Sequence, residues 1–402
     1  MIERDVDILV VGGGLTGAIM LLALAQLGVN ALLIDAHPLA ERTQADFDAR
    51  SLALSPASVQ ILKMLAIWPL LQAHATAIET IHVSEQNQWG RTLLNSKEDE
   101  PLGYVVEMQD IQRVLAHLLD SASMMAHAKL VAFDPQHNIA TVQQFDQQFS
   151  VRAQVVVAAD GADSAVRQFC KLPVKIKDYA QSALVANIGL LRPHQHIAYE
   201  RFTPSGPMAL LPMSQQRTAM VWSLAPQDAD QLMAVAEDEF LARVQRTIGY
   251  RLGRLSKVGK RVLYPLRQVI MKQTVLHSIV FIGNAAHTLH PVAGQGFNLG
   301  LRDVAMLAQC IVEKGLTADM LQHYQQVRQY DHTTMAWLTD GLVELFTKEL
   351  PGFGLARGTA LALLDNAPFL KTALMRYARG YAGEPSDLAC GIPLPSRVFA
   401  HE

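Results

Sequence analysis

The chain opens with two short apolar runs separated by a helix-type segment. Residues 7–11 and 31–35 each have the length and apolar content of a buried strand. Between them, residues 18–27 are rich in alanine and leucine, which favours a helix, and Gly28 suits the C-cap of that helix. The pattern therefore predicts a β-α-β unit within the first 35 residues.

The turn that joins the first strand to the helix has the glycine spacing of a dinucleotide-binding fingerprint. In such a turn the first glycine permits the bend, the second lets a pyrophosphate approach the backbone, and the third allows close helix–strand packing. The helix N-terminus adds free N–H groups and a positive dipole end. Asp35 closes the second strand, where a carboxylate can accept both hydroxyls of an adenosine ribose. The unit predicts dinucleotide binding without separating FAD from NAD, and the expected pyrophosphate contacts are Gly12, Gly14, Leu15, Thr16 and Gly17.

The middle of the chain has a different pattern of apolar and polar residues. Short apolar runs separated by proline and glycine predict antiparallel strands, and these runs are residues 182–191, 197–202, 208–213 and 218–224. Such a sheet suits one wall of a substrate pocket. The candidate residues for lining such a pocket are Tyr199, Met208, Leu210, Met213 and Trp222. For each of them the alternative is an ordinary position in the core of the sheet.

Composition and charge narrow the classes of function. The 402 residues are 50% apolar and 18% charged, so the chain can bury a large core. With 34 Lys and Arg against 37 Asp and Glu, the net charge of −3 argues against nucleic-acid binding. The three cysteines are far apart, and the pair His194 and His196 lacks an evident third ligand, so no metal site is predicted. We expect a cytoplasmic protein that attaches at most to the surface of a membrane.

Two further motifs follow buried-strand patterns. Residues 155–159 lead into Asp160-Gly-Ala-Asp-Ser-Ala-Val-Arg167. Residues 279–282 lead into Gly283-Asn-Ala-Ala, His290-Pro291 and a glycine-rich turn that opens a helix through Cys310. A helix N-terminus with small residues can meet a flat ring closely and stabilise negative charge on it.

The three motifs, in this order and spacing, resemble those of the class A flavoprotein aromatic hydroxylases, the para-hydroxybenzoate hydroxylase-like superfamily. The run 290–303 is similar to the ubiquinone-biosynthesis hydroxylases. The segments 50–55 and 103–108, and Asn284 where the superfamily usually has Asp, resemble the 2-polyprenyl-6-methoxyphenol hydroxylase branch. The resemblance extends through about residue 335 and implies FAD as the cofactor.

The resemblance also implies roles for individual residues. Arg50 and Arg113 would contact FAD, while Asp160 and Arg167 would lie beside the pyrophosphate, where NAD(P)H is thought to pass. Asn284 would replace the ribityl-binding Asp as a weaker, uncharged partner. The remaining residues expected around the cofactor, most of them at the isoalloxazine ring, are Gly283, Pro291, Gly294, Gln295, Gly296 and Asn298. His287 is expected to be structural, and no catalytic residue is assigned.

The implied fold is α/β, with a Rossmann-like FAD-binding domain, an inserted antiparallel β-sheet substrate domain and a helical C-terminal tail. The expected domains are residues 1–75, 101–175 and 276–335 for FAD, 76–100 and 176–275 for the substrate, and 336–402 for the tail. The implied reaction is reduction of FAD by NAD(P)H, capture of O₂ as a C4a-hydroperoxide and hydroxylation of a polyprenylated phenol in ubiquinone biosynthesis. The alternatives are a sister hydroxylase, a flavin reductase of the geranylgeranyl-reductase type and a non-catalytic, FAD-stabilised assembly subunit.

The tail combines apolar side chains with four basic ones between residues 342 and 381. This composition suits an interfacial helix pair, formed by residues 356–364 and 368–381, that meets the inner membrane or other ubiquinone-biosynthesis proteins. The same pattern also arises when helices simply cover the FAD domain. The sequence leaves both interpretations open.

Overall fold

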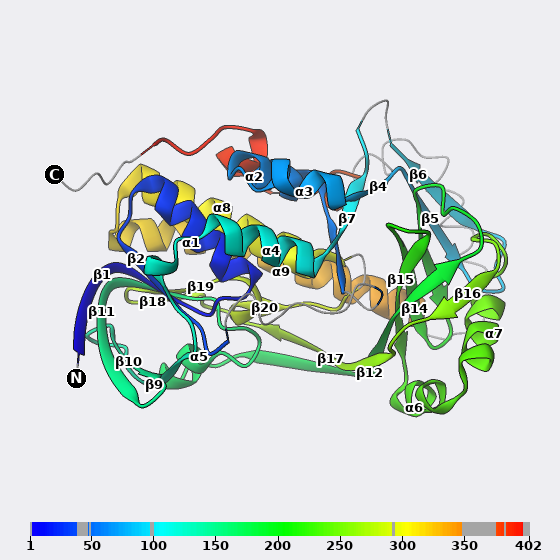
Figure 1. Ribbon diagram of the computed structural model, residues 1–402, viewed down its shortest axis with the longest axis horizontal. Helices are drawn as coiled ribbons and strands as arrows, with labels where there is room; N and C mark the ends of the chain where they lie inside the picture. The colour runs from blue at the N-terminus through cyan, green and yellow to red at the C-terminus, as the bar shows by residue number, and fades with distance from the viewer. Residues whose placement is uncertain are drawn as a thin grey trace.

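The computed structural model describes residues 2–37, 47, 50–96, 100–291, 294–347, 375–381 and 383–396. Figure 1 shows two lobes, one with helices stacked on a sheet and a second built mainly of strands, joined by the long strands β12 (Lys175–Leu190) and β17 (Val262–Ile270). The α/β fold class expected from the sequence is confirmed. No helix among the described residues is long and apolar enough to cross a membrane.

The first lobe is built on an eight-stranded sheet. Its central strands pair in parallel, as the β-α-β pattern predicts. The order along the sheet is β18 (Val275–Leu276), β19 (Ile279–Phe281), β11 (Gln147–Ala158), β1 (Ile2–Val11), β2 (Ala31–Ile34) and β8 (Met124–Met125). The antiparallel strands β10 (Ile139–Gln144) and β9 (Ala128–Asp134) extend it from β11.

Both faces of this sheet are buried. Ile8 and Val10 on β1 belong to the core beneath the helices, whereas Leu9 and Val11 belong to the core formed with β9 and β10. Figure 1 shows the helices stacked over the first face, with the short helix α5 (Ala165–Phe169) on the other side. The covering helices are α1 (Leu15–Leu27), α2 (Pro56–Met64), α3 (Trp68–Leu71), α4 (Met108–Leu118), α8 (Gln295–Lys314) and α9 (Ala318–Thr347).

Helix α1 is apolar around its circumference because it is enclosed by the sheet and by neighbouring helices. It ends at Gly28, whose φ of 75° is the left-handed conformation expected at this C-cap. The side chain of Thr16 packs against α8. A Cβ added to Gly300 would lie 3.1 Å from Thr16 Oγ1, so the absence of a side chain there lets the two helices approach closely.

The second lobe is a nine-stranded sheet. Its order is β20 (His287–Thr288), β17 (Val262–Ile270), β12 (Lys175–Leu190), β15 (Arg217–Leu224), β14 (Gly206–Met213), β13 (Ile197–Thr203), β5 (Thr80–Glu85) and β6 (Arg91–Asn95), with β16 (Leu255–Val258) beside β12. The four runs predicted between residues 182 and 224 all form strands of this sheet and pair antiparallel in it. Helices α6 (Pro226–Ala234) and α7 (Glu237–Ile248) cover one face.

A small three-stranded sheet lies between the lobes, in the order β3 (Ser51–Leu54), β7 (Gly103–Glu107) and β4 (Thr76–Ile78). Short 3-10 turns complete the described elements, namely η3 (Gln72–His74), η4 (Ser121–Ser123), η5 (Gly283–Ala285) and η7 (Asp387–Cys390). The predicted domain division remains a prediction, although helix α9 runs unbroken through the expected boundary at residue 336.

The tail is described only in part. Leu388 and Ala389 of η7 are buried in the same core as α1 and α2, and the backbone N–H of Ala57 donates to the carbonyl oxygen of Arg379 at 3.1 Å. The described end of the chain is therefore part of the first lobe. The predicted helix 356–364 and the first part of 368–381 lie outside the described residues.

Candidate functional site

The turn between β1 and α1 has a shape that requires glycine. Gly12 has a φ of 104°, and an added Cβ would lie 2.6 Å from the carbonyl oxygen of Ala159. A Cβ on Gly17 would lie 2.0 Å from the carbonyl oxygen of Gly12. Gly14 has the opposite environment, since nothing lies within 4 Å of its added Cβ. The turn therefore packs tightly on its inner side and leaves open backbone toward the cavity, as a pyrophosphate needs.

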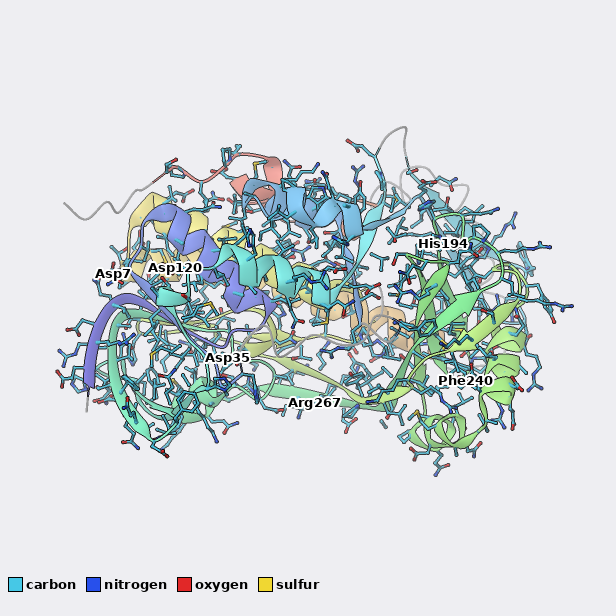
Figure 2. The ribbon with its side chains drawn as sticks, viewed as in Figure 1. Asp7, Asp35, Asp120, His194, Phe240 and Arg267 are labelled. Carbon is cyan, nitrogen blue, oxygen red and sulfur yellow. The ribbon has the colours of Figure 1, made fainter. Side chains whose placement is uncertain are left out.

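A cleft of about 420 Å³ begins at this turn and is lined by Gly12, Gly14, Asp35 and Asp160. Figure 2 shows Asp35 in the first lobe, on the side that faces the middle of the molecule. Its carboxylate accepts hydrogen bonds from the backbone N–H of Gly13 and, at 2.6 Å, from that of His37. Asp35 is thus held at the end of β2 within the cleft, and its contact with an adenosine ribose stays a prediction.

The two charged ends of the Asp160–Arg167 motif have separate roles in the structure. Asp160 lines the cleft and accepts a hydrogen bond from Val166 N at 3.2 Å, and burial raises the pKa of its carboxyl group. Arg167 is buried away from both cavities, and its guanidinium donates to the carbonyl oxygens of Ala285, at 2.9 Å, and Ala162. Arg167 therefore ties this motif to the Gly283 motif.

Arg113 is also absent from the residues that line either cavity. Its side chain is 60% exposed and pairs with Asp110 one turn earlier in α4, at 2.8 Å. The structure places Arg113 in α4 but does not bring its side chain to the cofactor cleft.

A larger cavity, of about 1070 Å³, continues from the cleft and shares Gly14 with it. The cavity lies between the N-terminus of α8 and the second lobe, and it contains most of the residues that the resemblance assigned to the ring end of the cofactor. These are Asn284, Pro291, Gly294, Gln295, Gly296 and Asn298, and the cavity is also lined by Arg50 and by Leu15 and Thr16 of the expected pyrophosphate turn. Asn284 is exposed to the cavity, as a ribityl contact requires, while Gly283 is buried behind it.

The first turn of α8 is fixed by Asn298, whose amide is fully hydrogen-bonded. Its Oδ1 accepts from Ser55 N at 2.9 Å and from Ser58 Oγ at 2.7 Å. Its Nδ2 donates to the carbonyl oxygens of Ala53, at 2.9 Å, and Gly294, at 2.8 Å. The amide therefore positions the helix end, whose free N–H groups and dipole favour negative charge.

A buried carboxylate behind the Gly283 turn was not assigned from the sequence. Asp303 Oδ2 accepts from Gly283 N at 2.9 Å and lies 2.6 Å from His287 Nε2. Its Oδ1 accepts from Arg328 Nε at 2.8 Å and lies 2.7 Å from His332 Nε2. Burial would raise the pKa of Asp303, but the two imidazoles and Arg328 outweigh this effect and hold that pKa well below its usual range.

The ligand atoms of His287, Asp303 and His332 lie within 4.8 Å of one another, a spacing that a metal ion can bridge. Both oxygens of Asp303 are already engaged, however, and Arg328 supplies a positive charge at the same carboxylate. Burial lowers the pKa of His332 to about 4, so its neutral ring can donate Nε2–H to Asp303 at neutral pH. The group functions as a hydrogen-bonded anchor for the turn, and His287 has the structural position expected of it.

The second lobe supplies the far wall of the larger cavity. Because side chains alternate across a sheet, Ala198, Glu200 and Phe202 on β13 and Ala209 and Leu211 on β14 line it. Of the residues proposed from sequence, only Tyr199 is in this lining. Met208, Leu210 and Trp222 point into the core with α6 and α7, and Met213 is buried in another core cluster. For these four residues the ordinary core role is the correct one.

Three features together define a flavoprotein of the FAD-binding class. They are the glycine turn between β1 and α1, the cleft at Asp35 and the N-terminus of α8 at the larger cavity. In agreement, a family model described as "FAD binding domain" matches residues 5–333. The ubiquinone hydroxylase UbiL of Rhodospirillum rubrum is 34% identical over 98% of this chain and 94% of that protein. The 3-demethoxyubiquinol 3-hydroxylase of Escherichia coli is 31% identical over 94% of this chain and 100% of that protein.

Among solved structures, p-nitrophenol 4-monooxygenase PnpA from Pseudomonas putida DLL-E4 shares the fold, with a TM-score of 0.78 and 16% identity over 96% of this chain and 100% of that one. The chain belongs to the family of FAD-dependent monooxygenases that includes the ubiquinone hydroxylases.

Proposed function

We propose that this enzyme hydroxylates the aromatic ring of a polyprenylated phenol in ubiquinone biosynthesis, with NAD(P)H as reductant and O₂ as the oxygen source. The observation that carries this proposal is the larger cavity, which extends from the FAD motifs at Asn284 and Gly296 to apolar side chains at Val83, Phe202 and Leu211. Its volume of about 1070 Å³ is slightly above the range of roughly 300–1,000 Å³ that is typical of ligand sites. The cavity therefore suits a flavin ring with an apolar aromatic substrate beside it.

The chain's own groups perform binding, orientation and exclusion of water. Gly12, Gly14 and the start of α1 would hold the pyrophosphate, and the start of α8 would stabilise negative charge on the flavin ring. When bound, FAD would supply the activation of O₂ for insertion of one oxygen atom into the ring. The apolar walls keep water from the reacting oxygen, which would otherwise be lost as H₂O₂.

A polyprenylated phenol dissolves in lipid far better than in water, because each buried CH₂ contributes about 0.8 kcal/mol to its transfer. We therefore propose that the enzyme works in the cytoplasm at the inner membrane, in peripheral contact with lipid or with other ubiquinone-biosynthesis proteins. Sedimentation of the full chain with anionic vesicles, compared with neutral vesicles, tests the lipid contact.

The function is tested with the purified, FAD-loaded enzyme and 2-geranylphenol, a short-chain phenol of the proposed class. We expect consumption of NADH or NADPH and O₂ together with a product that is one oxygen atom heavier by mass spectrometry. Fragmentation of that product identifies the ring position. Reductant consumption without O₂, accompanied by reduction of the prenyl chain, would instead identify a reductase, and extraction of NAD without flavin would refute the assignment.

A further inference from the structure

One carboxylate lies in the apolar wall of the larger cavity. Glu200 is in the middle of β13, where its cross-strand neighbours are Val83 on β5 and Ala209 on β14. Val221 on β15 lies opposite Ala209. All four residues line the cavity, and Glu200 is the only carboxylate among the described residues that do so. An acidic side chain thus occupies a surface that is otherwise built for an apolar ligand.

The environment of Glu200 does not stabilise its charge. Its Oε1 is buried and has no hydrogen-bond partner in the described part of the chain. The residue as a whole is half-buried, and burial of a carboxylate oxygen without a partner is costly. Burial raises the pKa of Glu200 to about 7. Acids with such shifted pKa values gather at functional sites because proton transfer near neutral pH needs them.

The charged and titratable groups around Glu200 have other positions or partners. Asp340 and Glu344 on α9 both pair with Lys177 on β12. On the flavin side of the cavity, burial lowers the pKa of His290 to about 4, so this imidazole is neutral at pH 7. Other charged or titratable groups on the cavity lining and on strands β5, β12 and β13 include Arg50, Tyr179, His82, Glu85, Tyr199, Arg201 and Arg379. Arg251 lies near enough for its charge to lower the pKa of His82, Tyr199 and Arg201.

We propose that Glu200 binds the phenol hydroxyl of the substrate and accepts its proton, so that the ring reacts as the phenolate. This role rests on the proposed function. The phenol O–H bond breaks and an O–H bond forms on the carboxylate, while the electron pair stays on the phenol oxygen and delocalises into the ring. The ring carbon that receives oxygen becomes a better nucleophile. Later, the hydrogen displaced from that carbon leaves as a proton, and Glu200 returns its own proton to the phenolate product.

The overall change is balanced. The phenol, O₂, NAD(P)H and one proton give the hydroxylated phenol, NAD(P)⁺ and water. Glu200 ends the cycle as the carboxylate that began it, and the reductant and O₂ are those of the proposed reaction.

The test compares FAD-loaded wild-type enzyme with Glu200→Gln, which keeps the size of the side chain and removes the base. With 2-geranylphenol we expect product formation to fall roughly 100-fold or more, since a general base typically contributes 10²–10⁴-fold. Reduction of the flavin by NAD(P)H without substrate should be unchanged. In the wild type kcat/KM should rise with pH through about 7, because the base must be unprotonated, and this rise should disappear in the variant.

Glu79→Gln is the matched control, since Glu79 is exposed and immediately precedes β5. Glu200→Asp should keep the pH-dependent rise at a lower rate. Anaerobic titration of the flavin absorbance with 2-geranylphenol adds a readout without turnover, in which Glu200→Gln should bind several-fold more weakly. A Glu200→Gln enzyme with the wild-type rate, pH profile and binding overturns this role alone, whereas a wild type that hydroxylates no phenol overturns the proposed function with it.

Discussion

The amide nitrogen of Asn298 donates to the carbonyl oxygen of Ala53, 2.9 Å away, and so joins the first turn of α8 to strand β3. The same side chain accepts hydrogen bonds from Ser55 and Ser58 at the start of α2. The helix end that faces the cavity and the strand that follows Arg50 are therefore fixed to each other by one buried amide.

Replacement of Asn298 by Ala should weaken both the fold and FAD binding. The change leaves Ser55 N and two carbonyl oxygens without their partner, and each unsatisfied buried group costs about 1–3 kcal/mol. We expect a loss of about 2–4 kcal/mol in urea unfolding and a higher Kd for FAD by fluorescence titration. Asn95→Ala, at an exposed position of β6, is the control. If the two variants are equally stable, Asn298 does not hold the helix end.

Because Asn284 is exposed, its replacement should change the affinity for FAD without changing the stability of the fold. Asn284→Leu should raise the Kd for FAD about 5- to 150-fold, because a ribityl hydroxyl would lose a hydrogen bond of roughly 1–3 kcal/mol. Its melting temperature without FAD should match the wild type, since the side chain has no buried contact to lose. Asn284→Asp, the residue usual in the superfamily, should bind FAD normally. Equal affinity in all three proteins would exclude a ribityl contact.

The half-buried side chain of Glu200, whose Oε1 has no hydrogen-bond partner among the described residues, should lower stability above neutral pH. Its pKa is about 7 in the folded chain against an ordinary value of 4.5, so between these values the folded state binds more protons than the unfolded state. Stability from this group is therefore lost as pH rises through 7. Glu200→Gln should be more stable than wild type at pH 8 by about 1–3 kcal/mol, given roughly 1.4 kcal/mol per pKa unit. Calorimetry at pH 5 should show a smaller difference, and a difference independent of pH would contradict the shift.

The described C-terminal residues, 375–381 and 383–396, should be needed for an enzyme that folds and binds FAD. Leu388 and Ala389 fill the core beside α1 and α2, and Met375, Ala378 and Arg379 line the larger cavity. Deletion of residues 375–402 should therefore give insoluble or flavin-poor protein, judged by soluble yield and by the ratio of flavin to protein absorbance. Deletion of residues 397–402 alone is the control. A soluble, FAD-bound product of the longer deletion would show that this segment is dispensable.

Much of the fold could be predicted because the glycine fingerprint and the short apolar runs depend on local backbone rules. Gly12 and Gly17 have contacts that no side chain allows, and such constraints are visible in the sequence. The face of the sheet toward which a side chain points is harder to predict from the sequence. On strands that are buried on both faces, apolar residues occupy every position, so Met208 and Ala209 could not be assigned to core and cavity.

The site residues that escaped prediction depend on contacts between distant segments. Asp303 ends the run 290–303, but its partners His332 and Arg328 come from α9, which carries no motif of its own. Arg167, by contrast, was predicted beside the pyrophosphate, but its guanidinium donates to the backbone carbonyl of the distant residue Ala285. Glu200 lies in a strand that carries no motif, and the one available signal was the charged pair Glu200 and Arg201 within the run 197–202.

The strands β12 and β17 pair with each other, with one register shift between Asp178 and Gln181, and extend from the first lobe into the second, as Figure 1 shows. Figure 2 shows Arg267 on this ribbon, between the lobes. Arg267 also pairs with Asp163, at 2.7 Å, in the loop that follows β11. A hinge across the ribbon would have to break these ladder hydrogen bonds, so the ribbon acts as a stiff spacer. The spacing between the α8 end of the cavity, in the first lobe, and the cavity wall that carries Glu200, in the second, is thereby maintained by paired backbone.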